Sequence, residues 1–554
     1  MKNLECFFCI FPAGADIHAR FILDEIRRAN LHKRSFFPEY GSDQTISPSF
    51  VDKLFAIFSL KSKMGLTVIR HKILPLYAKS RRLMAKQNES TSGLLRKLPS
   101  VDTILSSREL RHYVAEAGRK VVVDSIRRAI DEIRTLIISG QTGGMDETAI
   151  RERIVSGAKQ HLEAATAPHY RKVVNATGII LHTALGRAVL SPSALRQIQK
   201  ELAGYSLLQA DIETGKRSRR DEAVERLLKQ LTGAEAATVV NNNAAATSIV
   251  LNTVADGKEV IVSRGQLVEI GGAFRLPDVM AFSGAELVEV GTTNKTHAHD
   301  YANAITENTA AILRVHPSNY KIQGFSSEVP LDELVDIAHS NKLTMIDDIG
   351  AGALIDFSRF GFEPEPTLAE SISKGADIVT SSADKLIGAS QGGIILGRAE
   401  LIGAVRKNQF ARIVRIGKLT LATLEATLKL FLDESLALAE VPTLKMLRRN
   451  SAEIAKQAKR LASQLNKDIA EAEVKTIAGF SQMGSGSLPA QNLATTLVAV
   501  RPAKINAELL AKQLRQYRTP IFTRIQNEQV LMDPRTLLVG DDKIVIEALS
   551  EILG

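Results

Sequence analysis

The strongest constraint on the fold of this chain is the alternation of short Val/Ile-rich segments with helical segments between residues 171 and 432. Clear apolar strands are expected at Glu259–Ser263, Ala311–Val315 and Ile394–Leu396. Strands that alternate with helices build a sheet whose strands run mainly parallel. Residues 171–432 are therefore predicted to form a large α/β domain.

Two further domains are expected on either side of it. Residues 433–554 predict a smaller α/β domain, with a long helix near its start and a closing helix at its end. Residues 84–170 predict a helical domain, because apolar residues recur at helical spacing from Leu110 to Ile137 and Asp146 can cap the following helix. Basic residues gather on the outward face of this region, which by itself is typical of a solvated surface; they are Arg108, Arg111, Arg119, Lys120, Arg127, Arg128 and Arg134.

Residues 1–83 differ from the rest of the chain. They contain 14 lysines and arginines against 7 acidic residues, and so account for most of the formal net charge of +10. The charge is therefore poor evidence that the whole protein binds nucleic acid. The polar stretch from Met84 to Gly93 looks like an ordinary protein start. We expect Met84 to be the native initiator and 1–83 to be a mis-assigned extension; a genuine basic arm is the alternative.

Composition favours a cytoplasmic enzyme. A chain of 554 residues, 45% of them hydrophobic, can form several domains, and no apolar run approaches the roughly 18 residues of a membrane span. Cys6 and Cys9 form a CxxC pair, which occurs in redox and zinc sites, but the sequence has no second pair to complete a tetrahedral site. We therefore expect no metal.

Lys385 is the first candidate for catalysis. It follows the strand-like run from Ala376 to Ser382 and precedes a turn of small residues, 388–393. Burial lowers the pKa of an amine, and a neutral lysine can form a Schiff base with an aldehyde such as that of pyridoxal phosphate (PLP). Ser382 would then lie near the cofactor phosphate. A lysine after a strand is, however, usually a solvated loop residue.

Two other segments fit the same cofactor. A PLP enzyme needs a carboxylate against the pyridine nitrogen, and the strand-like run 343–349 supplies Asp348, with Asp347 on the opposite face as the alternative. The strand before Asn242, Asn243 and Ala244 runs into a helix of small residues, whose first turn suits a phosphate. Asparagine capping alone would explain the same pattern. The order of phosphate loop, aspartate and lysine is that of aspartate-aminotransferase-like enzymes.

Longer motifs extend this pattern to a known family. They run from about Leu94 almost to the C-terminus and comprise 94–102, 175–178, 181–183, 214–217, 240–246, 263–275, 291–294, 315–320 with 324–325, and 419–427. In this set of segments the chain closely resembles bacterial selenocysteine synthase, L-seryl-tRNA(Sec) selenium transferase. Residues 1–83 lie outside the resemblance.

The resemblance implies an aspartate-aminotransferase-like (fold type I) structure, PLP on Lys385, and a homo-oligomeric ring of dimers, a decamer. The implied substrates are selenocysteine tRNA charged with serine, which the helical domain would recognise, and selenophosphate as selenium donor. Arg217, Arg412 and Arg415 match family positions near that donor. At i, i+3 spacing, Arg412 and Arg415 are expected to share a helix face; they could also belong to a merely solvated basic stretch.

Some roles stay open at this stage. Asp384 could steer Lys385 or the substrate, or only cap a turn. His316 could touch the cofactor, although a histidine after a strand often has only a structural role. An enzyme acting on free amino acids needs an arginine for the substrate carboxylate, whereas an aminoacyl ester does not; Arg524 and Arg535 are the candidates.

The sequence departs from the family pattern near the predicted site. Ser218 and Arg219 replace the usual Gly-Ser pair, Ala383 replaces a glycine, and Ala389-Ser390-Gln391-Gly392-Gly393 replaces Gly-Pro-Gln-Ala-Gly. We expect slightly altered backbone geometry there. The alternative functions are a related PLP-dependent lyase acting on a small hydroxy-amino acid or sugar acid, and a catalytically inactive tRNA-binding protein.

Overall fold

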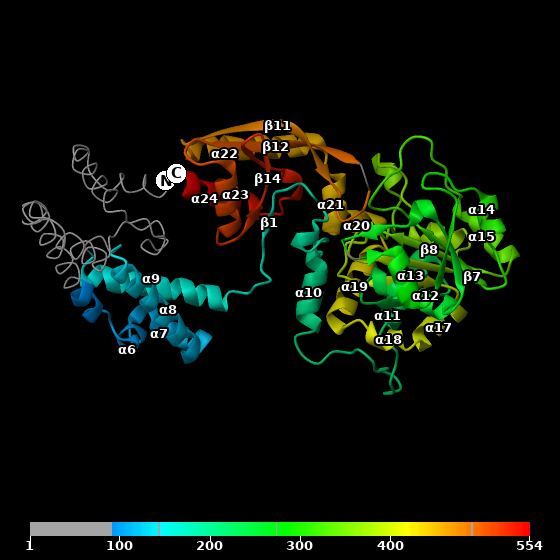
Figure 1. Ribbon diagram of the computed structural model, residues 1–554, viewed down its shortest axis with the longest axis horizontal. Coiled ribbons are helices and arrows are strands. Elements are labelled where there is room, and N and C mark those ends of the chain that lie inside the picture. The colour runs from blue at the N-terminus through cyan, green and yellow to red at the C-terminus, as the bar shows by residue number, and fades with distance from the viewer. Residues whose placement is uncertain (1–90, 142–144, 273, 489–490) are drawn as a thin grey trace, which may run out of the picture. The chain divides into compact units, whose positions relative to one another are not determined.

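The computed structural model describes residues 91–141, 145–272, 274–488 and 491–554 (Figure 1). The chain divides into two compact units, Met1–Tyr170 and Arg171–Gly554. Met84, Cys6, Cys9 and the rest of the 1–83 extension lie outside the described residues, so the expectation about the native start stays a prediction.

The described part of the first unit is helical, as predicted. Its named helices are α6 (Val101–Leu105), α7 (Arg108–Ala117), α8 (Arg119–Ile138) and α9 (Glu147–Thr166). Gly118, at φ 82°, separates α7 from α8, and the Asp146 carboxylate accepts the Ala149 N–H at 2.8 Å, which confirms the predicted cap. Apolar side chains of α8 and α9, including Ile126, Ile133 and Ile154, form one core.

All seven basic side chains predicted on the outward face of this unit are exposed. Acidic neighbours partly neutralise them: Arg119 lies 3.7 Å from Asp102, and Arg127 lies 3.6 Å from Asp124. Exposed pairs of this kind contribute little to stability. The face is therefore free to serve another purpose without disturbing the helical core.

The second unit is built on a seven-stranded sheet in the order β2-β10-β9-β8-β7-β3-β6. Its strands are β2 (Ala236–Val240), β3 (Glu259–Ser263), β6 (Glu286–Val290), β7 (Thr309–Val315), β8 (Thr344–Gly350), β9 (Ile378–Ser382) and β10 (Gly393–Gly397). All neighbouring pairs are parallel except those of β10, which runs antiparallel to β2 and β9. The central strands are buried along their length, as expected when helices cover both faces.

Helices cover the sheet on both faces. One layer packs apolar residues of α12, α13 and α17 against the strands, and the other uses α11, α14, α15, α16, α19, α20 and α21. Their bounds are α11 Glu222–Thr232, α12 Asn243–Ala255, α13 Leu276–Ser283, α14 Ala298–Asn303, α15 Leu331–Ser340, α16 Leu368–Ser373, α17 Ala399–Lys407, α19 Lys418–Leu430, α20 Glu434–Glu440 and α21 Pro442–Arg448. Helix α10 (Pro192–Glu201) packs on α19, and the one-turn α18 (Phe410–Ile413) follows α17.

A second sheet lies in the C-terminal part of this unit, in the order β11-β12-β15-β14 (Figure 1). Its strands are β11 (Ala472–Gln482), β12 (Asn492–Pro502), β14 (Arg524–Gln526) and β15 (Gln529–Met532), and all its pairs are antiparallel. Helices α22 (Ser451–Asp468), α23 (Ala507–Gln516) and α24 (Asp541–Leu553) pack on it. The long and closing helices match the sequence prediction, whereas β11 and β14 were not foreseen.

The C-terminal part also takes a strand from far upstream. Strand β1 (Val174–Asn175) pairs in parallel with β13 (Ile521–Phe522). Just beyond it, Gly178 has φ 74° and lies against Asp533, where an added Cβ would fall 2.2 Å from a carboxylate oxygen. Only glycine tolerates both this conformation and this contact.

These elements confirm the predicted fold class. The large domain is α/β with a mainly parallel sheet, preceded by helices and followed by a smaller α/β part. Among the described residues, no helix is both long and apolar enough to span a membrane.

Candidate active site

Lys385 lies just past the carboxyl end of β9 and is only 5% exposed. Within the described part of the chain, its amine makes no ion pair or hydrogen bond. Burial lowers the pKa of the Lys385 amine, and the positive charge of Arg187 lowers it further, against the opposing effect of Asp384, Asp348 and Glu365. The result is a buried lysine poised to lose its proton and act as a nucleophile or base.

Asp348 lies on the neighbouring strand β8 and pairs in register with Thr380 of β9. Its carboxylate is 3% exposed and accepts hydrogen bonds from Asn243 Nδ2 and Thr247 Oγ1, both at 2.8 Å. Burial nevertheless raises the pKa of this carboxyl. A cationic ring nitrogen placed against this carboxyl would stabilise its ionised form.

Asp347, the alternative, points the other way. It is fully buried and accepts two hydrogen bonds from Arg314 Nη1, at 3.1 and 3.3 Å. Successive residues of a strand face opposite sides of the sheet, so only one of the two aspartates can face α12. The contacts with Asn243 and Thr247 of α12 identify that residue as Asp348.

The predicted phosphate loop joins β2 to α12. Asn242 is the N-cap, since its Oδ1 accepts the Ala245 N–H at 2.9 Å, and Asn243 supports Asp348. The N–H groups at the first positions of a helix, here Asn243 and Ala244, have no acceptor within the helix and suit a phosphate. Strand β10 passes close by: an added Cβ on Gly393 would lie 2.0 Å from the Asn242 carbonyl oxygen.

The serines and the departures from the family pattern occupy the turn around Lys385. Ser382 is buried, and among the described residues the fully buried Ser381 Oγ has no hydrogen-bond partner. Ala383 donates its N–H to Gly392 O at 2.9 Å and does not have a positive φ, so alanine fits there without strain. Ser390 Oγ donates to Thr420 O at 3.2 Å.

Asp384 has a partner that sequence reasoning missed. Arg187 Nη1 donates to Asp384 Oδ2 at 2.8 Å, and the Asp384 side chain is mostly buried. Arg187 itself has φ 61°, an uncommon conformation for a residue other than glycine. It follows a single turn of helix, η3 (Thr183–Leu185), and Gly186. This ion pair, rather than a turn cap, fixes the residue next to the lysine.

The three predicted donor-site arginines are exposed and gather beside the phosphate loop. Arg415 forms an isolated bridge with Val240, and Val414 O accepts the Asn241 N–H at 2.9 Å. Arg412 lies on α18, but α18 ends at Ile413. The prediction that Arg412 and Arg415 share a helix face is therefore wrong, because the chain leaves the helix to pair with β2.

Arg220 holds this cluster together. It donates to Ile416 O at 2.9 Å and to Gln209 Oε1 at 2.7 Å, joining the loop before α11 to the turn after α18. Burial lowers the pKa of Arg220, as do the nearby charges of Arg415, Arg412 and Arg217. Four like charges at close range form a ready site for a compact anion.

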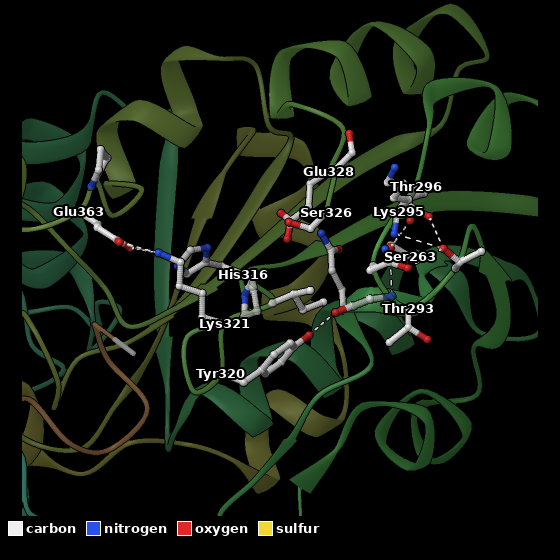
Figure 2. A pocket seen from close by; sticks show the side chains of 18 of the residues that line it. Ser263, Thr293, Lys295, Thr296, His316, Tyr320, Lys321, Ser326, Glu328 and Glu363 are labelled. Carbon is white, nitrogen blue, oxygen red and sulfur yellow. Dashed lines mark hydrogen bonds and ion pairs between the residues drawn. The ribbon is translucent and has the colours of Figure 1, made fainter. Parts of the chain in front are cut away.

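His316 lies at the end of β7, and its N–H donates to Asp348 O at 2.8 Å. Its Nε2 lies 3.0 Å from the buried Glu365 carboxylate. His316 also lines a cavity of about 210 Å³ with residues after β3 and β6. Figure 2 shows His316 there with Tyr320 and with the ion pair between Lys321 and Glu363. His316, whose backbone is bonded to Asp348, thus forms part of the wall of this hollow.

The two candidate carboxylate-binding arginines are already occupied. Arg535, 3% exposed, donates to Ser481 Oγ, Met446 O, Arg449 O and Ala494 O at 2.8–3.2 Å. Arg524 donates to Phe480 O at 3.0 Å and contacts Asp533 at 3.5 Å. Both arginines brace the C-terminal sheet.

The arrangement fits PLP. It offers a buried lysine, a buried carboxylate two residues before the end of β8, a helix N-terminus and, at Thr380 in register with Asp348, a buried hydroxyl without a partner among the described residues. These are the groups that an aldehyde, a pyridine nitrogen and a phosphate require.

Comparison with known proteins agrees with this geometry. The model of the family described as L-seryl-tRNA selenium transferase matches residues 173–538, and that of the selenocysteine synthase N-terminal region matches 95–134. An L-seryl-tRNA(Sec) selenium transferase of Clostridium botulinum is 44% identical over 460 residues, covering 83% of this chain and 99% of the relative. That of Alkaliphilus metalliredigens is 46% identical over 464 residues, covering 83% and 98%.

A solved structure of D-glucosaminate-6-phosphate ammonia-lyase aligns with a TM-score of 0.48 and 23% identity, covering 69% of this chain and 96% of that one. The two sequence relatives cover more of this chain than this structure does, 83% against 69%, and at a higher identity. On their evidence, the chain belongs to the L-seryl-tRNA selenium transferase family.

Proposed function

We propose that this protein converts seryl-tRNA(Sec) to selenocysteinyl-tRNA(Sec) with PLP as cofactor. The observation that carries the proposal is the buried, unpaired Lys385 beside the buried Asp348, in a chain of this family. When bound, PLP supplies an electron sink that stabilises negative charge at the substrate Cα. Lys385 would hold its aldehyde, Asp348 its ring nitrogen, and the first turn of α12 its phosphate.

The residues of the chain then divide the work. The neutral Lys385 amine removes the proton from the seryl Cα and later returns it, because its lowered pKa suits proton transfer. The Cβ–O bond breaks and the hydroxyl leaves with a proton as water; the selenium of the donor then forms the Cβ–Se bond, while water breaks its bond to phosphorus. The Arg187–Asp384 ion pair fixes the backbone beside Lys385 and so orients its amine. Burial of the site excludes water from the reacting atoms.

Selenophosphate is the proposed selenium donor. Arg217, Arg412 and Arg415 present exposed guanidinium groups beside the phosphate loop, and guanidinium forks suit phosphate-like anions. Arg406, from the same basic stretch, instead lies 2.8 Å from Glu225 and serves the structure. The exchange of a hydroxyl for selenium would release one inorganic phosphate per turnover.

The arginines in the C-terminal part support an ester substrate. Arg535 is held by protein acceptors, and Arg524 donates to Phe480 O and contacts Asp533, so both guanidinium groups are engaged within the C-terminal part. In an aminoacyl-tRNA that carboxylate is esterified and needs no such partner. This favours the transferase over the related lyase acting on a free hydroxy-amino acid.

The remaining roles follow the family. The exposed basic face of the helical domain, from Arg108 to Arg134, would recognise the tRNA, and the protein would act in the cytoplasm as a ring of dimers, a decamer. Three exposed large apolar side chains, Leu195 of α10, Leu419 of α19 and Ile413 of α18, are consistent with contacts between subunits.

Reconstitution tests the function directly. Incubation of the protein with PLP, seryl-tRNA(Sec) and selenophosphate is expected to yield selenocysteinyl-tRNA and phosphate in equal amounts, measured after hydrolysis of the ester. Failure of this reaction, together with release of ammonia from a small hydroxy-amino acid, would instead establish the lyase.

The arginine cluster makes a separate prediction. Replacing Arg412 or Arg415 by alanine should raise the KM for selenophosphate about 10- to 100-fold, because a charge-assisted hydrogen bond contributes about 1.5–3 kcal/mol. Exchange of the seryl Cα proton in heavy water, followed by mass spectrometry, should be unchanged. Lys418→Ala is the matched control, an exposed cation at the start of α19. An equal loss in that variant would contradict a specific anion site.

A further inference from the structure

A second cavity, of about 610 Å³, lies between the large sheet domain and the C-terminal part of the same unit. We call it the Arg448 cavity. It is lined by residues 360–363 at the end of η5 (Phe357–Phe360) and just beyond it, by residues 447–449 at the end of α21 with Ser451 of α22, by residues 491–494 around the start of β12, and by Arg535. No role assigned above accounts for it.

The Arg448 cavity is positively charged. Arg449 donates to Pro534 O and to Gln457 Oε1, and Arg535 donates only to carbonyl and hydroxyl oxygens. Neither guanidinium is bonded to a carboxylate. Glu363, the acidic residue of the lining, is bonded to Lys321 at 2.5 Å. The two fixed guanidinium groups therefore favour an anion in the cavity.

One wall is an aromatic ring flanked by cations. The guanidinium carbon of Arg448 lies 5.9 Å from the centre of the Phe360 ring, and that of Arg359 lies 5.8 Å from it. Arg359 is bonded to Glu434 at 2.6 Å, whereas exposed Arg448 has no ion pair among the residues that the structure describes. A planar guanidinium beside a ring gives a flat surface on which a base can stack.

The cavity adjoins the His316 hollow through one residue. Glu363 lines both the Arg448 cavity and the His316 hollow of Figure 2. That hollow also contains Glu365, whose charge reaches Lys385. The Glu363 N–H donates to Gln491 Oε1 at 3.0 Å, and among the described residues the Gln491 amide N–H groups have no acceptor. A chain-like substrate could thus extend from the His316 hollow to Arg448.

We propose that the Arg448 cavity binds a nucleotide of the single-stranded 3′ end of the aminoacyl-tRNA. This deepens the function proposed above and rests on it. The amino acid of such a substrate is attached to the last nucleotide, so the preceding nucleotides must lie just outside the reaction centre. Single-stranded RNA is held by stacking on aromatic and arginine planes and by cations along its phosphates. Phe360 with Arg448 provides the stacking surface, and the charges of Arg448 and Arg449 provide the cations.

Binding of shortened RNA tests the proposal. The full-length protein is titrated, at one fixed salt concentration, with uncharged tRNA(Sec) that is either intact or lacks its four 3′-terminal nucleotides. Arg448→Ala is expected to weaken binding of the intact tRNA about tenfold, as loss of one stacked base would. It should change binding of the shortened tRNA less than about twofold, because the lost contact is absent there. Arg448→Lys keeps the charge without the plane and should lie in between.

The matched control is Arg515→Ala, an exposed arginine in the last turn of α23 outside the cavity. It should behave as wild type with both RNAs. Equal weakening of both RNAs by Arg448→Ala, or no weakening of either, overturns the nucleotide subsite while the proposed reaction stands. If the wild-type protein forms no selenocysteinyl-tRNA and binds neither RNA, the proposed function and the subsite fall together.

Discussion

Replacing Lys385 by methionine should reduce formation of selenocysteinyl-tRNA by about 10⁴-fold or more, because the base that moves the Cα proton is lost. The same variant should unfold less readily than the wild type when both lack cofactor. Methionine has a similar length and no charge, whereas the wild-type lysine is only 5% exposed and has no ion-pair or hydrogen-bond partner among the described residues. The expected gain in free energy of unfolding is about 1–3 kcal/mol, measured by urea denaturation.

The stability gain should depend on pH in a defined direction. The pKa of folded Lys385 is lowered, so the unfolded chain binds the proton more tightly and the wild type gains stability as pH rises toward 10.5, the ordinary lysine value. The advantage of Lys385→Met should therefore be largest below the lowered pKa and shrink toward pH 10.5. A variant that loses both activity and stability would contradict the picture of an unpaired buried amine.

Asp348→Asn is expected to lower the rate about 10²- to 10³-fold, the usual effect of removing one preorganised electrostatic partner. An asparagine can keep the hydrogen bonds with Asn243 and Thr247, so the backbone should not move. Burial raises the pKa of Asp348, and the charged form is therefore unfavourable in the empty site. Without cofactor the variant should be more stable than the wild type, increasingly so as pH rises through the raised pKa.

Added PLP is expected to reverse the order of stability of the wild type and Asp348→Asn. It should raise the unfolding midpoint of the wild type more than that of Asp348→Asn, since only the aspartate compensates a cationic ring nitrogen. Asp347→Asn on the opposite face is the control. It leaves the half-buried Arg314 with a weaker partner and should destabilise the protein with or without PLP. An equal PLP response in the two variants would place the ring nitrogen elsewhere.

Much of the fold was readable from local pattern. The apolar runs of β2, β3, β7, β8 and β9 were predicted because each is short, buried and bounded by polar or small residues. The antiparallel direction of β10 was not predicted, because the apolar run Ile394–Leu396 has the same pattern in either direction. Strand β11 was also missed: its exposed and buried residues mix polar and apolar types, and its pairing with β12 is decided by tertiary contact.

The site was predicted only where local sequence determines it. Lys385 and Asp348 stand at strand ends, and Asn242 stands at a helix start, so each was found from its neighbours. Arg187 was not, because it meets Asp384 across nearly 200 residues of chain. The hydrogen bond from Asn243 to Asp348 also depends on a contact between distant segments, as does the inclusion of Arg220 in the arginine cluster.

The pairing of β1 with β13 bears on how the polypeptide is made. The ribosome releases Val174 long before Ile521, and the whole catalytic sheet is synthesised between them. That sheet can fold before the last segments of the C-terminal part have been synthesised. A message truncated before codon 521 would leave a product with the upstream edge segment unpaired and Gly178 without its aspartate neighbour. Quality-control proteases could then start cleavage at this unpaired segment near residue 174.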